Sequence, residues 1–209
     1  MNILHIDCSP RAHSHSRELS TAIVAQLLRN QPSASVTRRD LGRHPLPHAT
    51  ADYAQILSSP SATANNPNKE AVQLSEQLIN EVEMSDVLVI GTPMNNFTVP
   101  SVLKAWIDQI LRMDRTIGVS ETGRKVGLLQ DKPVHIAVAS GGVFFGERAN
   151  QPDFLTPYLV AALGCIGLHS LKFFRLQATA LLDEATITRQ REEIVQILRL
   201  SLTLNAPHE

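Results

Sequence analysis

The stretch SDVLVIGTPMNNFTVP, residues 85–100, indicates the fold class of this chain most directly. Its apolar run from Val87 to Ile90 is uninterrupted, which is typical of a strand that is covered on both faces. A stiff loop between Pro93 and Pro100 follows, and Pro100 can open a helix because proline is tolerated at a helix start. Strand, loop and helix in this order form the unit from which parallel α/β sheets are built.

Similar units lie on both sides of this stretch. The expected strands are Asn2–Cys8, Ser35–Asp40, Asp86–Gly91, Val134–Ser140 and Ser170–Phe174. Apolar residues that recur at helical spacing predict the helices between them: Leu19, Ile23 and Leu27; Leu74, Leu78 and Val82; Leu103, Ile107 and Leu111; and Ile187, Ile194 and Leu198 after Asp183. The alternation predicts an α/β protein with a doubly wound, five-stranded parallel sheet and helices on both faces.

Size and composition restrict the classes of protein to consider. The 209 residues and the 43% hydrophobic content suit one domain, residues 1–209, with a core of ordinary size. The 19 Lys and Arg residues nearly balance the 20 Asp and Glu residues, so a formal net charge of -1 gives no reason to expect nucleic acid or an anionic membrane as partner. Cys8 and Cys165 form no C-x-x-C pair, which suits a reducing compartment.

Targeting segments and long links also bear on the class of protein. The first residues lack the basic start and apolar stretch of a signal peptide, and no run reaches the roughly 18 apolar residues of a membrane span, so a cytoplasmic protein is expected. His44–Asn66 predicts a surface excursion with a short helix around Tyr53–Leu57. Arg112–Asp131 is a long link of the kind that is often functional.

Ligands of an open parallel sheet bind beyond the carboxyl ends of its strands, which singles out three loops. The first loop, after Cys8, carries Ser9, Ser14 and Ser16 and leads into a helix without any glycine. Hydroxyls and free amides at a helix N-terminus favour a phosphate. Alternatively, these serines only cap the helix and form turns.

The other two loops suit a flat heteroaromatic ligand. The loop Met94–Phe97 offers amides, a thioether and an aromatic ring, although Asn95 and Asn96 could form an ordinary turn and Phe97 could be a core residue. In the loop after Ser140, Gly141 and Gly142 permit close approach of a ligand to the backbone, but a plain tight turn would also use Gly-Gly. The coincidence of the three loops on one sheet edge predicts a ligand with a phosphate and a planar ring.

As a set, these loops resemble those of the FMN-dependent NADH-azoreductases, also described as NADH:quinone reductases. The matching residues are Ser9-Pro10-Arg11 with Ser14-His15-Ser16, Pro93–Phe97 with Pro100 and Leu103-Lys104, Ser140-Gly141-Gly142, Thr156–Leu159 and Leu163–Gly167. The resemblance covers most of the chain and implies a flavodoxin-like sheet of strand order 2-1-3-4-5.

The resemblance also implies roles for these residues. Ser9, Ser14 and Ser16 would hold the FMN phosphate with His15 between them; Met94, Asn95, Asn96 and Phe97 would line the isoalloxazine; and Ser140, Gly141 and Gly142 would meet its pyrimidine edge. NADH or NADPH would be the co-substrate of a ping-pong hydride transfer through FMN, and a quinone or azo compound would be the acceptor. The protein would assemble as a homodimer with its active sites at the subunit interface. No nucleophilic residue and no metal are implied, because the cofactor performs the chemistry.

The chain departs from the family pattern at a few positions. Asn95 replaces a tyrosine, Ala139-Ser140 replaces a frequent Ser-Arg, and Ile117 and Val119 replace aromatic residues of the long link. These changes concern the space above the ring, so they bear on acceptor preference more than on flavin binding.

Other features of the sequence allow alternative interpretations. Residues 118–125 resemble a Walker loop, but Arg124 occupies the lysine position. Cys8 lacks the arginine that a phosphatase loop needs at Ser14, so an inert thiol is expected. The histidines show no metal-ligand spacing, and Trp106 could face the core or a second subunit. The competing function is a flavodoxin-like electron carrier, although such carriers are usually shorter and strongly acidic.

Overall fold

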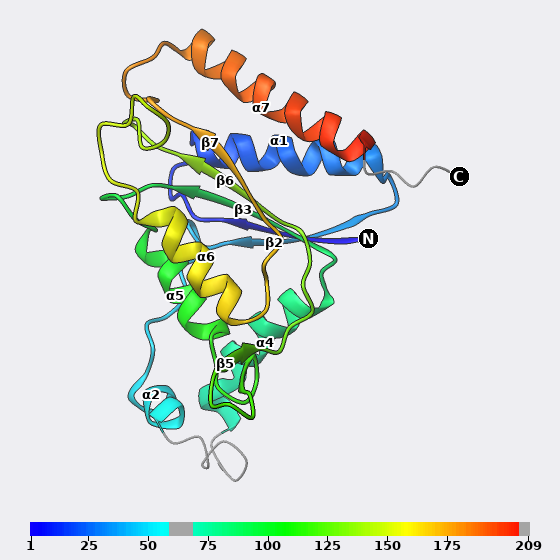
Figure 1. Ribbon diagram of the computed structural model, residues 1–209, viewed down its shortest axis with the longest axis vertical. Coiled ribbons are helices and arrows are strands. Elements are labelled where there is room, and N and C mark those ends of the chain that lie inside the picture. Colours follow the sequence, from blue (N-terminus) through cyan, green and yellow to red (C-terminus); the bar gives the residue numbers. More distant parts are fainter. Residues whose placement is uncertain (59–68, 205–209) are drawn as a thin grey trace.

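The computed structural model describes residues 1–58 and 69–204, and its centre is a five-stranded parallel sheet (Figure 1). The strands are β1 (Asn2–Asp7), β2 (Ser35–Asp40), β3 (Val87–Pro93), β6 (Val134–Ala139) and β7 (Leu171–Leu176). They lie in the order β2-β1-β3-β6-β7, and every neighbouring pair is parallel. Counted along the chain, this is the expected order 2-1-3-4-5, so the predicted fold class is confirmed.

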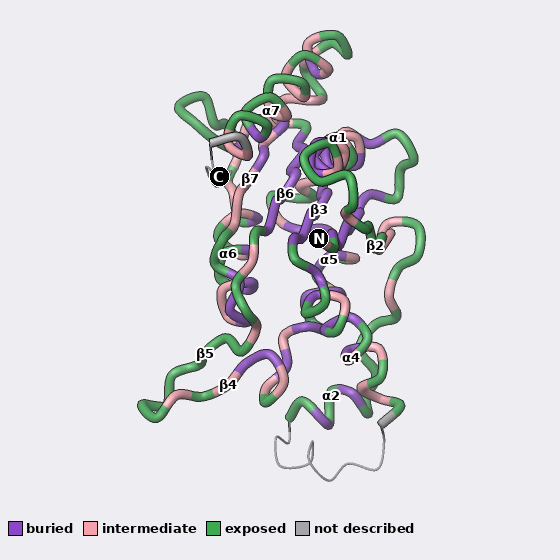
Figure 2. Tube along the Cα trace, turned by 90° about the vertical axis from the view of Figure 1, so that its right-hand side faces the viewer, coloured by how far each residue is buried: buried purple, intermediate pink, exposed green. Residues whose placement is uncertain are grey.

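Two layers of helices cover the sheet (Figures 1 and 2). One face packs against α1 (His15–Asn30) and α7 (Glu184–Leu204), and the other packs against α4 (Lys69–Met84), α5 (Ser101–Ile110) and α6 (Leu155–Cys165). Alternate residues of β3 point to opposite cores, with Leu88 in one and Val89 in the other. This double covering explains the uninterrupted apolar run of β3.

The helical stripes point inward as predicted. Leu19 and Ile23 of α1, Leu78 of α4, Leu103 of α5 and Leu198 of α7 are completely buried. Trp106 is also completely buried in α5, so it belongs to the core and not to an exposed face. The helix α6 was not predicted from a stripe, because its residues are apolar on most sides and show no amphipathic period.

The two long links contain structure of their own. The short helix α2 (Ala51–Ser58) confirms the helix expected around Tyr53, while the rest of that excursion after residue 58 lies outside the described residues. The link after α5 forms an antiparallel hairpin of β4 (Ile117–Val119) and β5 (Lys125–Gly127). Because this hairpin provides no strand-to-helix turn, the Walker-like residues 118–125 form no phosphate loop. No helix in the described part of the chain is long and apolar enough to cross a membrane.

A buried histidine in β6 makes the stability of this fold sensitive to acid. His135 is 8% exposed, its ring lies 5.7 Å from that of Phe174, and burial, together with the nearby Lys172, lowers its pKa from 6.5 to about 4. The unfolded chain therefore takes up a proton at higher pH than the folded chain does, so stability is lost as the pH falls from about 6.5 to about 4.

We expect the free energy of unfolding to fall by about 3 kcal/mol through this histidine across that window. The measurement is urea unfolding of the wild type and of His135→Phe at neutral and acidic pH. Phenylalanine keeps the aromatic contact with Phe174 but cannot titrate, so the wild type should lose more stability than the variant. Parallel pH profiles for the two proteins would contradict this role for His135.

Candidate active site

The three loops singled out from the sequence begin at the same edge of the sheet. The register places Asp7 beside Gly91 and Pro93 beside Ala139, so the ends of β1, β3 and β6 are adjacent. Backbone hydrogen bonds continue past the strand ends: the amide of Cys8 donates to the carbonyl of Gly91 at 2.8 Å, and the amide of Met94 donates to that of Ala139 at 2.8 Å. The loops are thus anchored side by side where a parallel sheet binds its ligands.

Buried hydroxyls and free amides characterise the first loop. Ser9 and Ser14 are each 2% exposed, and Ser16 is completely buried. Ser14 is the N-cap of α1, but its side chain makes no capping hydrogen bond; its Oγ lies 3.0 Å from Oγ of Ser16 instead. Within residues 1–58 and 69–204, no acceptor faces the amides of residues 15–17. The interpretation that these serines only cap the helix is therefore wrong for Ser14, and the loop presents donors for an anion.

A buried ion-pair network of Arg17, Asp7 and Asp40, which we call the Arg17 network, stabilises this loop. Arg17 donates to Asp7 at 3.1 Å, to both carboxylate oxygens of Asp40 at 2.7 and 2.9 Å, and to the carbonyl of Ser9 at 2.6 Å. Burial by itself would raise the pKa of Asp7, but His5, Arg38 and Arg17 together hold it at about 2. Two carboxylates neutralise the charge of Arg17, so its guanidinium is not available to bind an anion. Its hydrogen bond to the carbonyl of Ser9 positions that residue instead.

A glycine outside the predicted site also shapes this loop. Gly42 follows β2, and a Cβ atom there would lie 2.0 Å from the carbonyl oxygen of Ser9. Its amide donates to the carbonyl of Asp7 at 3.1 Å. Any larger residue at this position would displace the main chain of Ser9. Sequence reasoning missed both Gly42 and Arg17, since nothing local to either residue reports the contact with Ser9.

The second loop is a strained turn. The amide of Asn95 donates to the carbonyl of Thr98 at 2.9 Å, and the amide of Thr98 donates back at 3.0 Å. The two residues between them have positive φ, 47° for Asn96 and 71° for Phe97. Asn95 and Asn96 do form a turn, but Phe97 is 44% exposed and is not a core residue. A bulky residue with positive φ is costly, and such strain is concentrated at ligand sites.

The third loop is joined to the second by Gln151. Its Nε2 donates to Oγ of Ser140 at 2.9 Å and contacts Sδ of Met94 at 3.3 Å. A Cβ atom on Gly142 would lie 2.4 Å from Oε1 of Gln151, so glycine makes room for this bridge. In the described part of the chain, the amides of Gly141 and Gly142 have no acceptor. Sequence reasoning predicted the two glycines and missed Gln151, which lies in an irregular loop.

The alternative sites are less suited to chemistry. Cys8 is completely buried, and burial raises the pKa of its thiol, so it is an inert residue. Ligand atoms of His15, Glu18 and Glu184 lie within 4.8 Å of one another, although the sequence showed no such cluster. Glu18 pairs with Arg191, which competes with a cation for that carboxylate. His15 is partly buried, and its Nδ1 has no hydrogen-bond partner among the described residues.

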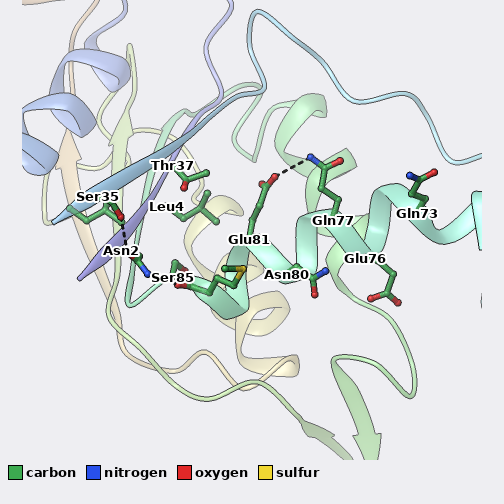
Figure 3. Close-up of a pocket in the computed structure, with 12 residues that line it drawn as sticks. Asn2, Leu4, Ser35, Thr37, Gln73, Glu76, Gln77, Asn80, Glu81 and Ser85 are labelled. Carbon is green, nitrogen blue, oxygen red and sulfur yellow. Dashed lines mark hydrogen bonds between the residues drawn. The ribbon is translucent and has the colours of Figure 1, made fainter.

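A cavity lies at the opposite end of the sheet (Figure 3). It measures about 680 Å³ and separates α4 from the first residues of β1 and β2, with Asn2, Ser35 and Thr37 on one side and Gln77 and Glu81 on the other. None of the predicted site residues line it. Short polar side chains on the strands leave this gap, and the carboxyl ends of the strands remain the candidate site.

Comparisons with known proteins agree with this geometry. A family model described as "Flavodoxin-like fold" matches residues 1–198. The chain is 47% identical to FMN-dependent NADH:quinone oxidoreductase 4 of Pseudomonas fluorescens, over 88% of this chain and 87% of that protein. It is 44% identical to FMN-dependent NADH:quinone oxidoreductase 5 of Burkholderia lata, over 93% of each chain.

Solved structures support the same fold. An azoreductase from Bacillus anthracis strain Sterne superimposes with a TM-score of 0.82 at 23% identity and covers 95% of this chain and 99% of that one. An FMN-dependent NADH-azoreductase from the Ames Ancestor strain, solved in complex with FMN, gives a TM-score of 0.81 at 22% identity, over 96% of this chain and 98% of that one. At these identities the likeness concerns the fold.

Proposed function

The chain belongs to the flavodoxin-like family of FMN-dependent NADH:quinone oxidoreductases, and on that premise we propose that it binds FMN and uses NAD(P)H to reduce quinones and azo compounds. The observation that carries the proposal is a set of buried serines at the start of α1, together with amides that have no acceptor among the described residues. They lie on the same sheet edge as two loops suited to a planar ring. A phosphate and a flat ring in one ligand match both features.

The first loop would hold the FMN phosphate with neutral donors. Ser9, Ser14 and Ser16 would contribute hydroxyls, the amides at the start of α1 would contribute N–H groups, and His15 would lie beside them. The residues fit the group because, in the described part of the chain, the amides of residues 15–17 have no acceptor and the hydroxyls of Ser14 and Ser16 bond only to each other. The dipole of α1 also favours an anion. Arg17 is already paired with Asp7 and Asp40, so the charge of the phosphate would be balanced mainly by amides and hydroxyls.

The other loops would orient the ring. Met94, Asn95, Asn96 and Phe97 would line its faces, and Ser140, Gly141 and Gly142 would meet its pyrimidine edge. Bound FMN would supply the redox chemistry, accepting hydride from NAD(P)H in one half-reaction and reducing the acceptor in the other. The free amides of Gly141 and Gly142 would favour negative charge at the pyrimidine edge, in the manner of an oxyanion hole.

The remaining proposals concern assembly and location. We propose that residues 1–209 form one domain that acts in the cytoplasm as a homodimer. Phe97 at 44% and Phe154 at 60% are large apolar residues exposed beside the ring loops, and the amide of Phe154 donates to the carbonyl of Phe97 at 3.0 Å. Exposed apolar side chains at one place favour a covering partner subunit.

The test is the visible spectrum of the purified protein after incubation with FMN and desalting. We expect retained yellow flavin that NADH bleaches without oxygen and that benzoquinone restores, with steady-state NADH oxidation when both substrates are present. A protein that cannot retain FMN would overturn the function and leave the fold intact. A flavodoxin-like electron carrier would retain FMN but oxidise NADH poorly with a soluble quinone, so this assay separates the two functions.

A further inference from the structure

A second cavity lies beside the edge strand β7, at the end of the sheet near the third loop. It measures about 510 Å³ and is bounded by residues of the loop after Gly142, by the segment after β7 and by α7. Val143 and Gln177 line it, but none of the eleven residues assigned above to the flavin does. We call it the Arg175 cavity, after one of the two arginines that line it.

The guanidinium of Arg175 in this cavity forms no direct ion pair with any described residue, although the charge of Asp153 acts on it. It lies 4.2 Å from the ring centre of Phe145 and 5.3 Å from that of Phe173. Within the described residues it forms no hydrogen bond and no ion pair, and its Nε is buried without a partner. Burial lowers its pKa, and the charge of Asp153 only partly offsets this effect.

Part of this guanidinium has lost its hydration, because Nε is buried and has no hydrogen-bond partner among the described residues. A partly desolvated cation that makes no hydrogen bond gives up hydration without a compensating contact. Stacking on aromatic rings recovers part of that loss and holds the planar guanidinium in one orientation. The free donors of Arg175 are thus fixed at the cavity, where a carboxylate, sulfonate or phosphate could accept from them.

The other groups around the cavity define the rest of the ligand. Arg148 also lines it, and neither arginine is in an ion pair among the described residues, whereas Glu193 is the acid on the lining. Leu181 is 70% exposed and Ile197 is 59% exposed, so an apolar wall is open to solvent. A second cation and an apolar wall complement an anionic group that is attached to an apolar body.

We propose that the Arg175 cavity binds a small organic anion with an apolar body, at a site separate from the flavin. Arg175 accepts the anionic group in a planar, two-point contact, Arg148 adds charge at the mouth, and Leu181 and Ile197 contact the apolar body. This proposal does not depend on the redox function, since none of its residues belongs to the flavin site.

The experiment is calorimetric titration of the FMN-loaded protein with naphthalene-2-sulfonate, with the neutral naphthalene-2-sulfonamide as the matched probe. We expect saturable binding of one sulfonate per chain and much weaker binding of the sulfonamide. Arg175→Gln should weaken sulfonate binding by at least about tenfold, because a hydrogen bond to a charged group is lost. It should leave the weak binding of the sulfonamide unchanged.

Two further variants keep the test decisive if Arg175→Gln folds poorly. Ile197→Ser, on the exposed wall, should weaken both probes, whereas Arg124→Met, on the distant β4-β5 hairpin, removes a surface cation and should weaken neither. Absence of saturable sulfonate binding to the wild type would overturn the proposal. Sulfonate binding that is insensitive to both Arg175→Gln and Ile197→Ser would also overturn it, because the probe would then occupy another site.

Discussion

Replacing Ser14 and Ser16 together by alanine is expected to weaken FMN binding by about two to four orders of magnitude while the affinity for riboflavin changes little. Each hydroxyl would lose a hydrogen bond to a charged phosphate, worth roughly 1.5–3 kcal/mol, and the two losses add. Riboflavin has the same ring without the phosphate. Quenching of flavin fluorescence on binding measures both dissociation constants.

The structure makes the double variant a clean test. The two hydroxyls lie 3.0 Å apart and bond to each other, so removing both leaves no buried polar partner unsatisfied, and stability should be nearly unchanged. The matched control is Ser120→Ala with Thr122→Val, which removes an exposed hydroxyl pair of the same separation, 3.0 Å, in the β4-β5 hairpin. An equal loss of affinity for FMN and riboflavin would show that Ser14 and Ser16 do not bind the phosphate.

The second large effect is expected at Arg17, where methionine should lower the free energy of unfolding by about 3 kcal/mol. Methionine has a similar length but no charge, and its introduction leaves the completely buried Asp7 and the partly buried Asp40 without their shared cation. Arg38 still donates to Asp7, which limits the loss. Urea unfolding of the FMN-free protein measures the change without a contribution from the ligand.

Lys104→Met is the control for the effect that the loss of one positive charge by itself has on stability. Lys104 pairs with Asp108 one turn along α5, both side chains are about half exposed, and a pair of this kind contributes about 0.5 kcal/mol or less. If Arg17→Met cost no more than Lys104→Met, the Arg17 network would not stabilise the first loop. Retained stability with normal FMN affinity would show that Ser9 needs no support from Arg17.

The amino-acid sequence by itself determined the helices and strands and the order in which they alternate along the chain. The apolar run of β3 is a local pattern that indicates a strand buried on both faces. The helical spacing of Leu19 and Ile23 is a local pattern that indicates a helix buried on one face. Chain order then places the loops after β1, β3 and β6 at one edge of a parallel sheet, so the three candidate loops could also be predicted. Strand ends differed by one or two residues, because hydrogen bonds and not composition set them: the expected Ser170–Phe174 is Leu171–Leu176 in the sheet.

Tertiary structure decided how those loops are held. Arg17 meets Asp40 from 23 positions away, and Gln151 reaches Met94 from 57 positions away. Gly42 and Ser9 come into contact because β2 lies beside β1. The exposure of Phe97 depends on what surrounds its side chain. The same holds for Nε of Arg175, which is buried without a hydrogen-bond partner in the described part of the chain. Periodicity reports the face of an element, whereas these contacts join elements distant in sequence, and only the packed chain specifies them.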